Sequence, residues 1–131
     1  MDEETIKYLI RNYKWDSTQI KLGIRAKCKC EYCDKDLFES ADNYMTWEKD
    51  HIIPKSSKLE NFDYETFDNL AIACKQCNYN FKHKYNPAIE IGYNKSRDEY
   101  ISTVRDYVKI KREQKDVDLE DAREIFKKYI K

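Results

Sequence analysis

The chain has 131 residues, with 25 Lys and Arg against 25 Asp and Glu, so its formal net charge is zero. This length predicts one domain, and the even balance of charge argues against a protein that coats nucleic acid nonspecifically. Only two Gly and two Pro are present, too few turn-forming residues for a barrel or sandwich of many short strands.

Helices are predicted at the start of the chain and two short strands in its middle. Apolar residues at helical spacing predict a helix over 3–10, and Asp16 and Ser17 can begin a second helix that runs towards Lys27. Strand-forming residues predict strands over 44–51 and 70–74. A polar segment connects the two.

The second half of the chain is predicted to be helical. A helical pattern runs from Asn78 to Asn86, where Pro87 ends it. A capping box at Ser96 begins a helix that reaches about Gln114, and Asp118 can cap a last helix. The residues expected on the buried face of that last helix are Leu119, Ala122, Ile125, Phe126 and Ile130.

The five cysteines predict a metal site. No apolar run approaches the roughly 18 residues of a membrane span, and the acidic start lacks the pattern of a secretory signal, so we expect a cytoplasmic protein without a membrane partner. In a reducing compartment an odd number of cysteines does not suit disulfides. The pairs Cys30-x-x-Cys33 and Cys74-x-x-Cys77 have the spacing of a closed, structural four-thiolate Zn²⁺ site. Cys28 is left over as a free thiol.

Forty residues separate the two cysteine pairs, and the motifs between and after them resemble a known family. Asp50-His51-Ile52-Ile53-Pro54, Asp68-Asn69-Leu70 and Cys74-x-x-Cys77-Asn78 are similar to the HNH endonucleases, the ββα-metal nucleases, in their four-cysteine zinc subgroup. The resemblance covers residues 25–87, and the last motif ends in Asn instead of His. It implies an α+β fold with a ββα-metal centre, stabilised by zinc and flanked by N- and C-terminal helices.

The resemblance also implies the roles of individual residues. His51 is expected to be the general base, because histidine titrates near neutrality and can accept a proton from water. Asp50 and Asn78 are expected to hold the catalytic Mg²⁺, for which Mn²⁺ can substitute, since both offer hard oxygen ligands. Asn69 is expected to brace the loop and orient the His51 ring, although Asp-Asn is also an ordinary turn pair.

Helix geometry distinguishes two further candidates. At 100° per residue, position 82 lies about 40° from the face of Asn78, whereas His83 lies about 140° away. We therefore expect Lys82 to reach the active site and bind a phosphate oxygen, with a solvated helix face as the alternative. His83 is expected to be peripheral.

The sequence thus predicts one domain, with helices in 1–27, a zinc-stabilised nuclease core in 28–87 and a helical extension in 88–131. The predicted activity is metal-dependent cleavage of DNA, with RNA as the alternative substrate, to 5′-phosphate and 3′-hydroxyl ends. Two other functions stay open: a catalytically silent nucleic-acid-binding zinc module, and a protein-interaction subunit. The C-terminal helices are the candidate surface for a homodimer or a partner protein.

Overall fold

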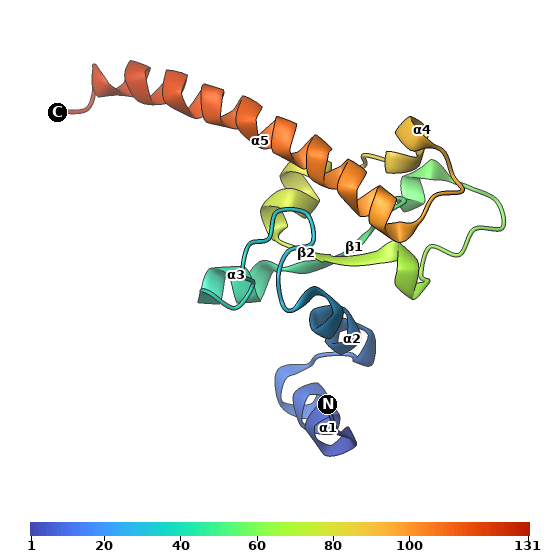
Figure 1. The fold of residues 1–131 in the computed structure, drawn as a ribbon. Coiled ribbons are helices and arrows are strands. Elements are labelled where there is room, and N and C mark those ends of the chain that lie inside the picture. The colour runs from blue at the N-terminus through green and yellow to red at the C-terminus, as the bar shows by residue number, and fades with distance from the viewer.

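The computed structural model describes all residues, 1–131, as a small antiparallel hairpin between helices (Figure 1). The α-helices are α1 (Glu3–Tyr13), α2 (Ser17–Ala26), α3 (Ala41–Thr46), α4 (Pro87–Ile91) and α5 (Arg97–Lys127). The strands are β1 (Glu48–His51) and β2 (Leu70–Ala73), and a π-helix, η3, spans Gln76–Lys82. Single 3₁₀ turns, η1 (Lys55–Ser57) and η2 (Phe67–Asn69), lie in the segment that connects the strands.

The hairpin forms the centre of the molecule. β1 and β2 are antiparallel, with Glu48 opposite Ala73 and His51 opposite Leu70. Every residue of β2 is buried, because α2 packs against this strand and the first half of α5 packs against η3, which follows it. The core around the hairpin includes Leu22, Leu37, Ile52, Ile72, Val104 and Val108.

The two N-terminal helices agree with the sequence prediction. The side chain of Asp2 caps α1 by accepting a hydrogen bond from the backbone N–H of Thr5. Asp16 and Gln19 form a reciprocal capping box at the start of α2. In this part of the chain, local capping residues and apolar spacing are therefore sufficient to predict where the helices begin.

The strand predicted over 44–51 is wrong in its first half. Residues 41–46 form α3, and the strand begins only at Glu48. Ser40 caps α3 by accepting from the backbone N–H of Asn43, and Tyr44 packs with Trp15 of the N-terminal segment. A local cap and a distant aromatic contact thus outweigh the strand preference of these residues.

Two helical predictions also need correction. The segment after Asn78 is a π-helix instead of an α-helix, since the backbone N–H of His83 bonds to the carbonyl of Asn78, five residues earlier. The break expected between Gln114 and Asp118 does not occur, because no Gly or Pro interrupts α5. The apolar face expected to be buried in this last part is exposed throughout 113–131.

The structure is α+β: a two-stranded antiparallel sheet, a four-cysteine cluster and flanking helices. None of the helices combines the length and the apolar character that crossing a membrane requires.

Candidate functional site

The four paired cysteines converge at one end of the hairpin. Cys30 and Cys33 follow α2, Cys74 follows β2, and Cys77 lies in η3. Their sulfur atoms all lie within 4.8 Å of one another, and those of Cys33 and Cys74 are 3.8 Å apart. Tetrahedral ligation with Zn–S bonds of about 2.3 Å places the sulfur atoms about 3.8 Å apart. The cysteines are therefore positioned to hold a tetrahedral metal ion such as zinc.

The electrostatics of the cluster favour a cation. Hydrogen bonding with Cys30 lowers the pKa of Cys33 to about 6 and also lowers the pKa of Cys74. Hydrogen bonding among the sulfur atoms raises the pKa of Cys30 and of Cys77, so a metal-free cluster holds protons that a bound metal ion would displace. The guanidinium of Arg112, on α5, donates to the sulfur of Cys77 at 3.6 Å and balances part of the thiolate charge. The cluster thus also anchors α5.

His51 ends β1 with its ring partly exposed. Its Nε2 lies 2.8 Å from a carboxylate oxygen of Glu65, in the segment that connects the strands. The same carboxylate pairs with the ammonium groups of Lys55 at 2.9 Å and Lys49 at 3.8 Å. Hydrogen bonds from Lys55 and His51 lower the pKa of Glu65 to about 2, so this carboxylate is charged at neutral pH. No hydrogen bond is made by Nδ1 of His51.

Asp50 faces the opposite side of β1 and is buried in an ion pair. Its Oδ2 accepts a hydrogen bond from the hydroxyl of Tyr32 at 2.6 Å and lies 3.1 Å from Nζ of Lys82. Nζ of Lys82 also donates to the backbone carbonyl of His51 at 3.0 Å. Burial lowers the pKa of Lys82, which the charge of Asp50 opposes, and burial raises the pKa of Tyr32.

The structure therefore corrects the role expected of Lys82. Its side chain has no exposed area, so its ammonium does not reach a phosphate at the surface. The π-helical geometry of η3 and the pairing with Asp50 turn Lys82 inward. It instead links β1 to η3, beneath His51.

Asn78 meets a carboxylate other than the expected one. Its side-chain amide donates to Oε2 of Glu48 at 2.5 Å, and no hydrogen bond joins it to Asp50. Glu48 is exposed and lies on the same face of β1 as Asp50, two residues away. Oδ1 of Asp50 accepts no hydrogen bond. Carboxylate and amide oxygens of Glu48, Asp50 and Asn78 are the ligand types that Mg²⁺ prefers, so this donor set suits a hard divalent cation.

Asn69 braces the segment between the strands. Its Oδ1 accepts from the backbone N–H of Ile53 at 2.8 Å, and its amide donates to the carbonyls of Ile53 at 3.1 Å and Tyr64 at 3.0 Å. It is 6% exposed. No hydrogen bond joins its side chain to the ring of His51, whose partner is Glu65. The contacts of Asn69 are thus those of a loop brace.

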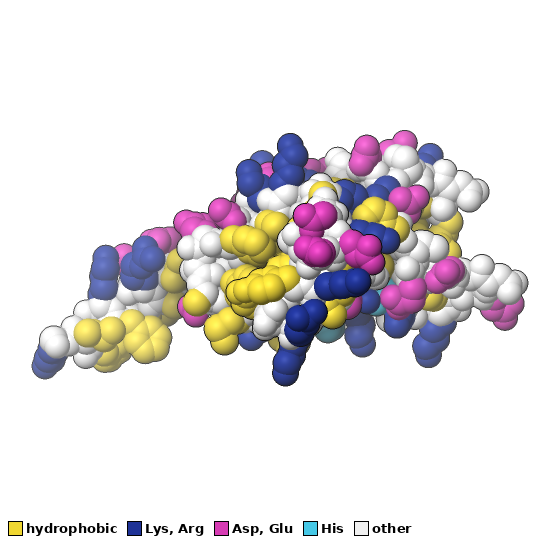
Figure 2. All heavy atoms as spheres, turned by 90° about the horizontal axis from the view of Figure 1, so that it is seen from below, with side chains coloured by type: hydrophobic (Ala, Val, Ile, Leu, Met, Phe, Trp, Pro, Cys, Tyr) yellow, Lys and Arg dark blue, Asp and Glu magenta, His cyan; other side chains and the backbone are white.

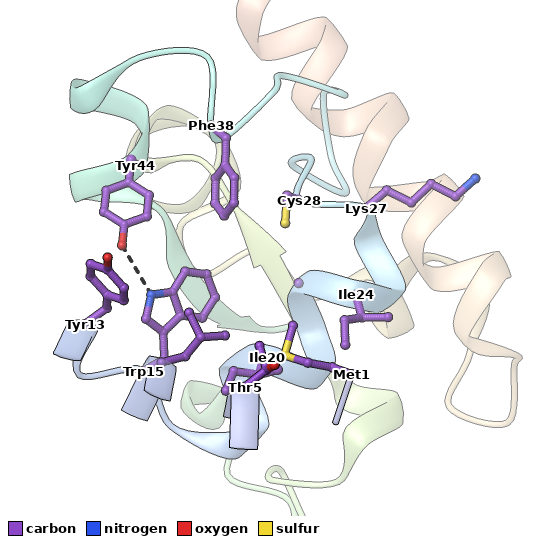
Figure 3. A pocket seen from close by; sticks show the side chains of 12 residues that line it. Met1, Thr5, Tyr13, Trp15, Ile20, Ile24, Lys27, Cys28, Phe38 and Tyr44 are labelled. Atoms are coloured by element: carbon purple, nitrogen blue, oxygen red, sulfur yellow. Dashed lines mark hydrogen bonds between the residues drawn. The ribbon is translucent and has the colours of Figure 1, made fainter. Parts of the chain in front are cut away.

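An apolar cavity lies apart from these residues. It encloses about 450 Å³ between α1, α2 and the start of α3, and Trp15, Ile20, Phe38 and Tyr44 are among its lining residues (Figure 3). Cys28 faces this cavity, and burial raises the pKa of its thiol, which keeps it protonated. The cavity includes neither His51 nor any of the four clustered cysteines.

Sequence reasoning missed three contacts of the site. Tyr32, inside the first cysteine pair, was not expected to bind Asp50. Glu65 lies fourteen residues after His51 in a polar segment without a motif, so no local signal indicated their contact. The contact of Glu48 with Asn78 was not expected either, although the alternation of a strand places Glu48 on the face of Asp50.

Comparison with known protein families gives a match over the middle of the chain. The family model described as HNH endonuclease matches residues 30–84, which include both cysteine pairs, the hairpin and η3. No curated protein sequence is significantly similar to the chain.

Proposed function

Since the family model described as HNH endonuclease matches residues 30–84, we propose that this chain is a metal-dependent endonuclease that hydrolyses phosphodiester bonds of DNA. The observation that carries the proposal is the partly exposed His51 ring, held by Glu65 at the end of β1, while Glu48 and Asn78 bring oxygen donors together on the opposite face of that strand. A structural Zn²⁺ ion bound by the four cysteines would fix the hairpin relative to η3 and α5.

In this proposal His51 is the general base. With the proton on Nε2, the ring donates to Glu65, and Nδ1 keeps its lone pair for a proton from water. Glu65 is then a positioning residue, because it fixes the tautomer and the orientation of the ring. The water oxygen bonds to phosphorus while the bond to the 3′ oxygen breaks. The products are a 5′-phosphate and a 3′-hydroxyl.

Asp50 and Asn78 are proposed to hold the catalytic Mg²⁺, with Glu48 as a third oxygen donor. Bound there, the cation would stabilise charge on the phosphate and on the leaving oxygen. The buried partners Tyr32 and Lys82 hold the Asp50 carboxylate in place. Asn69 supports the site indirectly, through the backbone of the connecting segment.

Two other lysines are better placed than Lys82 to bind the phosphate. Lys49 is partly exposed on the side of His51, Lys55 is exposed, and both pair with Glu65. A phosphate group carries the same charge sign as this carboxylate, so the two ammonium groups can bind it in the same region. This arrangement suits a nucleic-acid backbone and does not by itself favour DNA over RNA.

The proposal is tested by cleavage of supercoiled plasmid with the zinc-loaded protein, with added Mg²⁺ or Mn²⁺ and with EDTA. The chain has two histidines, which allow a matched pair of variants, His51→Asn and His83→Asn. His83 is exposed at the end of η3, and asparagine tolerates its positive φ. We expect metal-dependent nicks from wild type and His83→Asn and none from His51→Asn at equal zinc content. Cleavage by His51→Asn at the wild-type rate would refute the assignment of the base.

The buried ion pair of Asp50 favours a second candidate function. Because Lys82 already balances the charge of Asp50, the same fold could bind nucleic acid without cutting it. That module would shift labelled DNA or RNA in a gel, with both histidine variants behaving as wild type and no product at any metal concentration. The plasmid assay and the gel shift therefore separate the two functions.

A further inference from the structure

The C-terminal half of α5 extends away from the rest of the molecule. All residues of 113–131 are exposed, and Figure 1 shows this part of the helix beyond the hairpin and the other helices. Large apolar side chains are exposed on it: Leu119 is 51% exposed, Phe126 60% and Ile130 72%. Figure 2 shows hydrophobic side chains together at this outer end, on the left of the view. A helix in water is stabilised mainly by packing of its apolar face, so we expect this exposed apolar surface to pack against a partner.

Four of the exposed residues form a continuous apolar seam. Leu119, Ala122, Phe126 and Tyr129 follow one another at spacings of three, four and three residues, which is the a/d pattern of a coiled coil. Phe126 lies eighteen residues, or about five full turns, after Val108, so the two residues lie on the same line of the helix. Val108 is buried against the body, and the seam continues its face into solvent.

The charges along this segment identify the partner. Residues 113–124 contain six acidic and two basic side chains, whereas residues 125–131 contain three lysines and no acidic residue. Two parallel copies would place like charges side by side. Two antiparallel copies place the basic end of each beside the acidic stretch of the other, with Lys127 near Glu120 and Lys128 near Asp121.

We propose that this segment forms an antiparallel, two-fold symmetric helix pair with a second copy of the chain. With the axis near residue 124, Leu119 lies opposite Tyr129 of the other copy, and Ala122 lies opposite Phe126, so each a position meets a d position. The interface is isologous, because each copy contributes the same surface. If the proposed nuclease activity holds, the dimer carries one active site in each copy and can cut both strands of a duplex.

The test is the mass of the zinc-loaded full chain in sedimentation equilibrium, where the monomer is 15.9 kDa. Phe126→Asp should weaken the dimer by roughly 30-fold or more, because it places a charge in the seam. Val117→Asp is the matched control: Val117 is 70% exposed and lies about 180° from Phe126 on the helix, so this variant should stay dimeric. Both positions are exposed in the single chain, so neither variant should unfold it.

The orientation of the helices is tested by charge reversal. Lys127→Glu with Lys128→Glu should weaken the dimer, and adding Glu120→Lys with Asp121→Lys should restore it. A wild-type monomer at about 100 µM, or a dimer that Phe126→Asp leaves intact, would overturn the proposal. The proposal would also fail if the wild-type chain were a monomer and Lys127→Glu with Lys128→Glu reduced only its affinity for nucleic acid. A monomer that binds a different protein through this segment, and never a second copy, would overturn it as well. These masses do not depend on catalysis, so a catalytically silent chain leaves the test valid.

Discussion

Replacing Lys82 with methionine tests the buried ion pair under His51 most directly. The substitution removes the ammonium and keeps an unbranched side chain of similar length at a site with no exposed area. Asp50 is then left with Tyr32 as its one hydrogen-bond donor. The carbonyl of His51 also loses its contact with Nζ.

The expected loss of stability is about 3–4 kcal/mol. Removing one partner of a buried ion pair costs roughly 3–5 kcal/mol, because the other charge stays buried without compensation. A carboxyl group with the ordinary pKa of about 3.9 can take up a proton at pH 7 at a cost of about 4 kcal/mol, which limits the penalty. An unfolding entropy of about 2.1 cal/mol/K per residue converts this loss to a Tm decrease of about 11–15 °C for 131 residues.

Thermal unfolding of the zinc-loaded protein, followed by circular dichroism, measures this loss. Lys84→Met is the control, because Lys84 is exposed two residues away and should lower the Tm by less than about 2 °C. Adding Asp50→Asn to Lys82→Met should recover part of the stability, since the amide keeps an acceptor for Tyr32 and removes the charge. A Lys82→Met protein as stable as wild type would refute the reasoning.

Three further outcomes are expected. Asn69→Ala leaves three backbone groups of the connecting segment without their partner and should cost roughly 2–4 kcal/mol in chemical unfolding; an unchanged midpoint would contradict its role as a brace. Cys74→Ser, or zinc removal by a chelator, should abolish cooperative unfolding and lower the bound zinc measured by atomic absorption; normal unfolding without metal would contradict a structural site. Lys55→Met should raise the pKa of Glu65 from about 2 towards 4.5, followed by carboxyl NMR. Because folding lowers this pKa, the stabilisation from Glu65 is present above about pH 4.5 and is lost as the pH falls towards 2. In Lys55→Met the folded pKa is closer to 4.5, so the pH range over which this stabilisation is lost is narrower.

Several features of the fold were readable from short stretches of sequence. The caps at Asp16 and Ser96 predict helix starts because a side chain there bonds to a backbone N–H three residues on. The two Cys-x-x-Cys pairs predict one metal cluster because that spacing places two thiolates at adjacent corners of a tetrahedron. The helix caps involve residues within one turn of each other, and each cysteine pair is a four-residue motif, so both are readable without knowing the tertiary fold.

Other features depended on contacts between distant segments. Tyr44 has a strand former's side chain, yet it lies in α3, where it meets Trp15 from the N-terminal segment. The end of α5 has the pattern of a buried helix but is exposed, because the helix is longer than the body it packs on. Periodicity identifies an apolar face without saying what covers it.

The candidate site divides in the same way. The sequence by itself determined that Asp50, His51, Asn69 and Asn78 lie in one motif-bearing segment that also carries the second of two Cys-x-x-Cys pairs. Only the tertiary structure decided which partner each side chain takes: Glu65 for His51, Lys82 and Tyr32 for Asp50, and Glu48 for Asn78. The physical reason is that a motif fixes residue types and strand faces, whereas ion pairs and hydrogen bonds are selected by burial and by segments brought together only on folding.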